Sequence, residues 1–210
     1  SQILVATGLE LVTFRTVIPD FVSVIVANAC IIGSQIATQE GITRYMGKEG
    51  YLRKENWAIW SSMLAGFIYF TYVSPSVGNR IVVFSIAAAT LSLLSIITLK
   101  TRTADGDAPR RALIAVFFLH QCLTMYRALV AILQGGYAEF LNSGLLQAWG
   151  MIGAASFYAS LSLIFFWLIA HRLGLDSQRQ ALTDPLTGLS NRRAMDNVIG
   201  DLLPTTMERN

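Results

Sequence analysis

IVVFSIAAATLSLLSIITL, residues 81–99, decides the fold class of this chain, because it contains no Asp, Glu, Lys, Arg or His. A helix needs about 20 mostly apolar residues to cross the hydrocarbon core of a bilayer. This stretch is therefore predicted to be a membrane-spanning helix. The composition agrees, since 53% of the 210 residues are hydrophobic and 14% are charged, whereas soluble domains carry about 25% charged residues.

Five other stretches have a similar apolar character and complete the prediction of an all-α transmembrane fold. Short connections rich in Gly, Pro, Ser and Asn separate them, for example Pro19-Asp20 and residues 75–79. We therefore expect a six-helix membrane bundle over residues 1–170, embedded in a lipid bilayer as its main partner. The other five predicted spans are residues 3–18, 21–37, 57–73, 112–133 and 145–170.

The positive charges of the connections alternate between the two sides of this bundle. Only Arg15 and Arg80 fall on one side. The opposite side holds three groups of Lys and Arg, namely Arg44, Lys48, Arg53 and Lys54; Lys100, Arg102, Arg110 and Arg111; and Arg172, Arg179, Arg192 and Arg193. Cytoplasmic loops carry the excess of positive charge in membrane proteins. Both ends of the chain are therefore predicted to be cytoplasmic.

Several classes of protein are disfavoured by the remaining residues. No block of Lys and Arg interleaved with aromatic residues is present, so we expect no nucleic-acid partner. Cys30 and Cys122 lie in separate apolar stretches and read as packing residues, with neither disulfide nor metal spacing, and we expect no cofactor in this chain. The chain begins at Ser1 in apolar sequence without a signal peptide, so we expect residues to precede it.

Polar residues inside the predicted spans supply the candidate site. His120, Thr124, Arg127 and Gln134 have the spacing of one helical face. Ionisable groups at membrane depth are costly and usually face the bundle interior, where they bind ligands or partners. One interpretation is a pocket, open to the side opposite the cytoplasm, that binds an anionic or polar small-molecule signal. Its candidate residues are Glu10, Asn28, His120, Thr124 and Arg127.

A second interpretation is structural. Glu10 pairs with Arg127 in this view, while Asn28 and Gln35, seven residues apart, form hydrogen bonds between helices. Such bonds contribute about 0.6–2 kcal/mol in bilayers and are common. The sequence leaves both interpretations open.

The last predicted span continues into a predicted cytoplasmic linker helix, residues 171–183. Leu161, Leu168, Leu175 and Leu182 recur at intervals of seven residues. A heptad stripe can pair two parallel copies of a helix, so we expect a homodimer through the last span and linker. The alternative is a solvated linker helix, because Gly174 interrupts the pattern and several intervening positions are polar.

The stretch that follows, TDPLTGLSNRR, residues 183–193, is polar. Asp184-Pro185 ends the linker helix because a residue before proline is disfavoured in the α region. Gly188 permits a turn, and Asn191 is a good N-cap for a second, amphipathic helix that Pro204 ends. The pattern predicts the start of a cytoplasmic domain.

This segment resembles the D-x-L-T-G-L-x-N-R-R signature that opens GGDEF domains, the catalytic domains of diguanylate cyclases. Every fixed position is met, by Asp184, Leu186, Thr187, Gly188, Leu189, Asn191, Arg192 and Arg193. The resemblance covers about a tenth of the chain. It implies a multi-pass protein of the bacterial inner membrane, in which residues 184–210 are the opening fragment of a truncated α/β domain.

The resemblance also implies an enzyme that joins two GTP molecules into cyclic di-GMP with Mg²⁺. In that family the reaction takes place between two facing GGDEF domains, and the opening motif is structural. The implied signal-coupling residues are Leu175, Leu182, Asp184, Leu186, Thr187, Asn191, Arg192 and Arg193. The family's catalytic residues are expected beyond Asn210, so no catalytic residue is assigned and this fragment is expected to be inactive.

Three functions remain open on the sequence alone. The first is the sensory region of a diguanylate cyclase. The second is the input domain of a cyclic-di-GMP receptor with a degenerate GGDEF domain, or of a GGDEF-EAL phosphodiesterase. The third is a small transporter, which the absence of an internal repeat disfavours.

Overall fold

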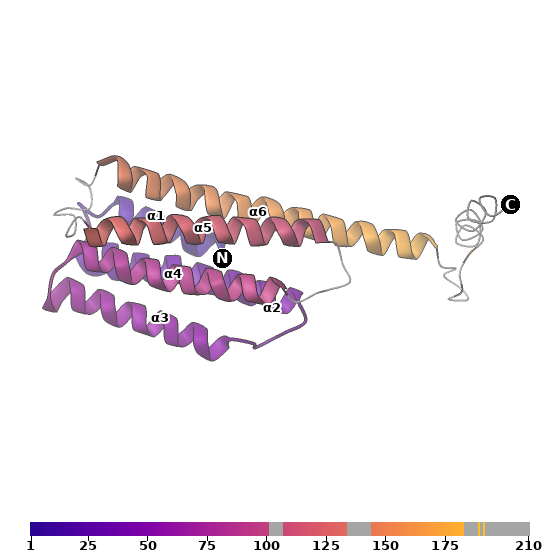
Figure 1. Cartoon of the computed structure of the whole chain (residues 1–210), viewed down its shortest axis with the longest axis horizontal. Coiled ribbons are helices and arrows are strands. Elements are labelled where there is room, and N and C mark those ends of the chain that lie inside the picture. The colour runs from indigo at the N-terminus through magenta and orange to yellow at the C-terminus, as the bar shows by residue number, and fades with distance from the viewer. Residues whose placement is uncertain (101–106, 134–143, 183–188, 190, 192–210) are drawn as a thin grey trace. The chain divides into compact units, whose positions relative to one another are not determined.

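The computed structural model describes residues 1–100, 107–133, 144–182, 189 and 191, and these residues contain helices and turns but no strand (Figure 1). The predicted all-α character is thus confirmed for this part of the chain. The predicted helix after Asn191 lies outside it. The elements are α1 (Gln2–Thr13), the π-helix η1 (Phe21–Val26), α2 (Ala27–Tyr45), α3 (Arg53–Ile68), the π-helix η2 (Tyr69–Val73), α4 (Val77–Lys100), α5 (Asp107–Leu133) and α6 (Gly144–Ala181).

Within the described part of the chain, four helical segments are long and apolar enough to cross a membrane: Phe21–Tyr45, Val77–Lys100, Ala108–Leu133 and Ile152–Gly174. They coincide with four of the six predicted spans, and they indicate a membrane protein. The other two predicted spans are also helical. However, α1 has only 12 residues, and α3 begins with the charged residues Arg53, Lys54 and Glu55.

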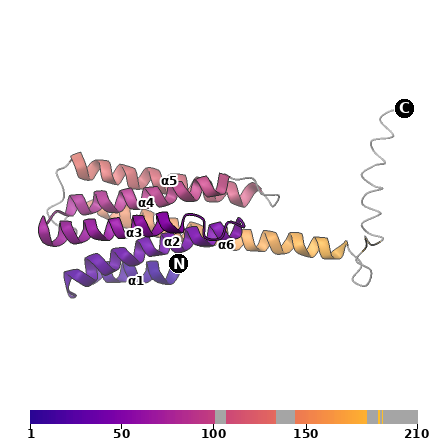
Figure 2. The same cartoon turned by 90° about the horizontal axis from the view of Figure 1, so that it is seen from below.

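Contacts divide the chain into two units, Ser1–Ile164 and Phe165–Asn210. In the first unit, α4 packs against α2, α3 and α5, and α1 packs against α2 (Figures 1 and 2). Apolar side chains from η1, α2, α3 and α4 form its core. The core residues are Val24, Ile25, Ile32, Met63, Phe67, Ala87, Ala88 and Leu91.

Small residues explain why α4 can be central. Ser85, Ala88, Ser92 and Ser95 are all buried and follow one another at helical spacing. Small side chains let helix backbones approach closely, which drives helix association where lipid removes the hydrophobic advantage of packing. The Ser95 hydroxyl donates to the carbonyl of Leu91 at 2.9 Å and so needs no partner from another helix.

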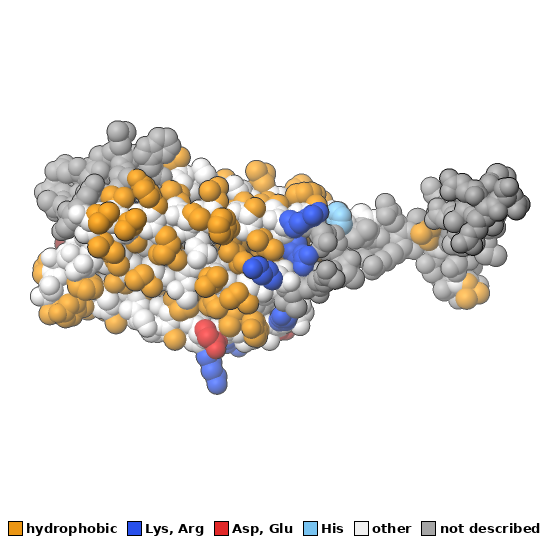
Figure 3. Space-filling model, viewed as in Figure 1, with side chains coloured by type: hydrophobic (Ala, Val, Ile, Leu, Met, Phe, Trp, Pro, Cys, Tyr) orange, Lys and Arg blue, Asp and Glu red, His pale blue; other side chains and the backbone are white. Residues whose placement is uncertain are grey.

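The outer surface of the helices is apolar, as expected for a protein solvated by lipid. On α4, Ile86 is 56% exposed, and on α5, Leu119 is 70% exposed. Figure 3 shows hydrophobic side chains over the sides of the helices, with Lys and Arg gathered toward one end on the face in view. In water, such surface would promote aggregation. In a bilayer it faces acyl chains.

The helix α6 runs without a break for 38 residues, about 57 Å at 1.5 Å per residue. It therefore includes both the predicted last span and nearly all of the predicted linker helix. Leu161 is 1% exposed and Leu168 is 4% exposed in the single chain. These two leucines of the heptad stripe are consequently not available as a surface seam. Any pairing through the stripe depends on its later part.

Candidate functional site

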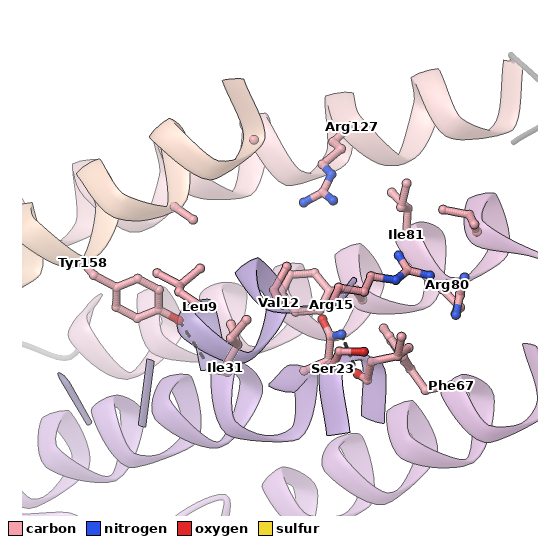
Figure 4. A pocket seen from close by; sticks show the side chains of 16 residues that line it. Leu9, Val12, Arg15, Ser23, Ile31, Phe67, Arg80, Ile81, Arg127 and Tyr158 are labelled. Carbon is pink, nitrogen blue, oxygen red and sulfur yellow. Dashed lines mark hydrogen bonds between the residues drawn. The ribbon is translucent and has the colours of Figure 1, made fainter. Parts of the chain in front are cut away.

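The first unit contains a cavity of about 110 Å³, and its lining residues come from η1 and from α1 to α6 or their ends (Figure 4). Two of its lining residues, Ser23 and Val24, belong to η1, and π-helical turns often occur at functional sites. The lining residues are Leu9, Val12, Arg15, Ser23, Val24, Asn28, Ile31, Phe67, Val77, Arg80, Ile81, Phe84, Arg127, Gly150, Ala154 and Tyr158.

Three arginines line this cavity, here called the arginine cavity, and no acidic residue is among the described residues that line it. Arg15 follows α1, Arg80 lies in the first turn of α4, and Arg127 comes from α5. Figure 4 shows the ends of Arg15 and Arg80 near each other, with Arg127 extending into the same space from the opposite side. Arg80 lies within electrostatic range of Arg15 and of Asp20.

Local structure positions these side chains. The Ser76 hydroxyl accepts a hydrogen bond from the backbone amide of Asn79 at 3.2 Å, an N-cap that starts α4 immediately before Arg80. The Arg80 guanidinium donates to the Thr71 hydroxyl at 3.4 Å, which holds it against η2. Beside Arg127, Gly150 leaves the backbone of α6 bare. A Cβ there would lie 3.5 Å from the Arg127 guanidinium nitrogen.

A smaller cavity of about 40 Å³ adjoins the arginine cavity and shares six of its lining residues. Gln35, His120, Leu123 and Thr124 complete it. Gln35 is 6% exposed, and its Oε1 atom has no hydrogen-bond partner among the residues that the structure describes. A space of this size has room for on the order of three waters, and an unpaired buried acceptor favours a polar occupant.

His120 is held as a packed residue on two sides. Its ring stacks on Phe157 with centroids 3.8 Å apart and 19° between the planes. Its Nδ1 atom lies 3.3 Å from the Ser92 hydroxyl of α4. Thr124 donates to backbone carbonyls of its own helix, including that of His120 at 3.0 Å. His120 and Thr124 therefore form part of the wall of the smaller cavity, and Arg127 supplies a positive charge to it.

Tyr158 of α6 lines both cavities and connects α6 to α2. The Ser34 hydroxyl donates to the Tyr158 phenol oxygen at 3.0 Å, and the phenol donates to the Ile31 carbonyl at 3.4 Å. Tyr158 is 6% exposed and Ser34 is completely buried. Tyr158 therefore belongs both to the walls of the cavities and to the packing of α6 on α2.

The structure brings together four of the five predicted ligand-binding residues. Arg127 lines both cavities, Asn28 lines the larger, and His120 and Thr124 line the smaller. Glu10 is exposed and lines neither. The structural interpretation of Asn28 differs from the observed geometry, because its amide donates to the Val24 carbonyl of the same helix at 2.7 Å. Gln134 lies outside the described residues.

Sequence reasoning missed four residues of the site. The sequence analysis treats Arg15 and Arg80 as charges of the connections and Gln35 as a residue that forms a hydrogen bond between helices. It assigns no role to Tyr158. One feature of the sequence could have identified Arg15 and Arg80. They are the only two Lys or Arg residues expected on their side of the membrane. Two positive charges that lie at the ends of different helices can line one cleft and attract an anion to it.

The predicted signal-coupling residues are only partly within the described chain. The backbone amide of Asn191 donates to the Leu182 carbonyl at 2.9 Å. Leu175 lies in α6, but its side chain is outside the description. The remaining predicted residues also lie outside the described residues, namely Asp184, Leu186, Thr187, Arg192 and Arg193.

Among the described residues, no group of three His, Cys, Asp or Glu side chains could hold a metal ion. Comparison with protein-family models, curated proteins and solved structures finds no match to this chain.

Proposed function

We propose that this chain is the membrane input region of a diguanylate cyclase and regulates cyclic di-GMP synthesis from two GTP molecules. The observation that carries the proposal is the complete D-x-L-T-G-L-x-N-R-R signature, which begins three residues after α6 ends at Ala181. A signature of this length in this place is specific, because it follows apolar helices and a long terminal helix, where an input region meets its output domain.

The geometry of α6 supports a route for the signal. Gly150, Ala154 and Tyr158 of α6 line the arginine cavity, and the same helix continues to Ala181. A ligand can shift a two-state protein only through differential affinity for the two states. In this proposal the ligand favours one position of α6 over another by contacts with these residues.

The proposed setting is the bacterial inner membrane, crossed six times, with both ends of the chain in the cytoplasm. The distribution of Lys and Arg between connections supports this orientation. It puts GTP and Mg²⁺ on the side of the signature. It also puts Arg15 and Arg80 toward the opposite side.

Dimerisation belongs to the same proposal, because two GGDEF domains must face each other to join two GTP molecules. With Leu161 and Leu168 buried, the proposed contact between copies uses Leu175 and Leu182. Cysteines introduced there should crosslink two copies in native membranes. Cysteine at the buried position of Leu161 is the matched control and should not crosslink.

The decisive experiment incubates the full-length protein in membranes with GTP and Mg²⁺ and measures cyclic di-GMP and pyrophosphate. Product formation is expected. Arg193→Ala, in the signature, should lower output roughly 2- to 30-fold, as coupling of about 0.5–2 kcal/mol implies. Arg53→Ala, at an exposed position that begins α3, is the control. Binding of cyclic di-GMP without synthesis would indicate a receptor, and its hydrolysis a phosphodiesterase.

A further inference from the structure

The arginine cavity combines two kinds of surface. At one end it presents the guanidinium groups of Arg15, Arg80 and Arg127, and Asp20 lies within electrostatic range of Arg80. Arginine presents several N–H donors in a planar fork that suits carboxylate and phosphate oxygens. This end therefore has the chemistry of an anion site.

Most of the rest of the wall is apolar, apart from the three polar side chains of Ser23, Asn28 and Tyr158. Leu9, Val12, Ile31, Ile81 and Phe84 contribute aliphatic and aromatic surface from α1, α2 and α4. A bare inorganic anion would leave this surface against water, whereas an apolar body buries it. The wall therefore favours an occupant with a hydrocarbon part attached to its anionic group.

The volume limits the size of this occupant. At about 10–15 Å³ for each water-sized unit, the cavity of about 110 Å³ holds on the order of ten such units. This corresponds to a molecule of roughly ten non-hydrogen atoms. A short-chain amphiphile fits the cavity, and so does the head of a longer lipid.

We propose that the arginine cavity binds an amphiphilic anion, a carboxylate or phosphate head on a short apolar body. The head lies among Arg15, Arg80 and Arg127, and the body lies along Ile31 and Phe84. The ligand is either a free acid or the headgroup region of an anionic lipid. As a signal, this ligand rests on the proposed function, but its binding does not.

Binding is tested first without GTP, on the full-length protein in nanodiscs of phosphatidylcholine. Three probes share an eight-carbon chain and differ in the charge of the head: octanoate, octanol and octylamine. Octanoate is expected to bind at least about tenfold more tightly than the other two, since one charged hydrogen bond suffices for that factor. Inorganic phosphate is expected to bind more weakly than octanoate. Equal binding of octanoate and octanol would overturn the proposal.

Variants localise the site. Arg127→Gln and Arg80→Gln should each weaken octanoate binding about tenfold or more. Arg53→Gln is the control, because Arg53 is exposed and lies outside the cavity. Ala154 lines both cavities, so Ala154→Leu reduces the space for the ligand without changing the charge and should also weaken octanoate binding. Unchanged affinity in Arg127→Gln and Ala154→Leu would overturn the proposal, and Ala154→Leu decides if an arginine variant fails to fold.

Added phosphatidylglycerol distinguishes the two sources of the anion. If the natural ligand is a lipid headgroup, this lipid competes with octanoate in the wild type and loses this effect in Arg127→Gln. If the ligand is a free acid, octanoate binding is the same in both bilayers. Absence of Arg127-dependent binding for both probes would refute the proposal. Cyclic di-GMP output is measured separately, so intact binding without an effect on output would refute only the signalling role.

Discussion

The backbone amide of Asn191 donates a hydrogen bond to the carbonyl oxygen of Leu182 at 2.9 Å. Leu182 comes directly after the last residue of α6, where backbone carbonyls lack partners within the helix. Asn191 belongs to the signature. The amide of this one signature residue therefore satisfies a backbone carbonyl at the end of α6.

Replacement of Asn191 by proline removes this donor, whereas Asn191→Ala keeps it. A hydrogen bond of this kind contributes about 0.5–1.5 kcal/mol. We expect Asn191→Pro to lower the stimulated cyclic di-GMP output of the full-length protein roughly 2- to 10-fold more than Asn191→Ala does. Equal output from the two variants, at equal amounts in the membrane, would show that the bond does not contribute to coupling.

The bond between Ser34 and Tyr158 makes a second prediction. Tyr158→Phe and Ser34→Ala each remove one partner of a buried hydrogen bond, and each should reduce the free energy of unfolding by about 1–3 kcal/mol. Their effects should add only in part, because both remove the bond between Ser34 and Tyr158, whereas Tyr158→Phe also removes the bond to the Ile31 carbonyl. Unfolding in detergent of the two single variants and the double variant gives the coupling energy. We expect about 0.6 kcal/mol or more, and strict additivity would contradict the assignment.

Much of this architecture follows from local sequence, and the site does not. The helices of residues 81–99 and 112–133 could be predicted because a helix is the stable form of a single long, mostly apolar segment in a bilayer. The gathering of Arg15, Arg80 and Arg127 could not, since it depends on how α1, α4 and α5 pack. The spacing of Leu161 was misleading for the same reason. A seven-residue spacing does not indicate whether the rest of the chain already buries the leucines.

The contact of α1 with α2 depends on Gly8. A Cβ at Gly8 would lie 2.8 Å from the carbonyl oxygen of Ala27 and 2.6 Å from Cγ1 of Ile31, so the two helices would have to separate. Gly8→Ala should reduce the free energy of unfolding by about 1–3 kcal/mol. Gly33→Ala is the matched control, because no atom lies within 4 Å of its added Cβ. Thermal unfolding in detergent that ranks Gly33→Ala as the less stable variant would refute this account.

The proposed orientation is testable by labelling of single cysteines after Cys30→Ala and Cys122→Ala remove the native thiols. Glu49 and Ser74 are both exposed, the first between α2 and α3 and the second after η2. In cells with a permeabilised outer membrane, an impermeant maleimide should label Ser74→Cys. It should label Glu49→Cys only after lysis. The reverse pattern would invert the proposed topology.

Because α6 is continuous, the number of residues in its linker determines the rotation, about the helix axis, of the segment that follows. Each inserted residue turns everything beyond it by about 100° and advances it by about 1.5 Å. Seven inserted residues make nearly two full turns and return the following residues within about 20° of their original direction. Insertions after His171 should therefore change cyclase output periodically, with two residues, a turn of about 200°, reversing the facing side and seven restoring it. Linkers of related proteins with this architecture should accordingly differ in length by steps of seven.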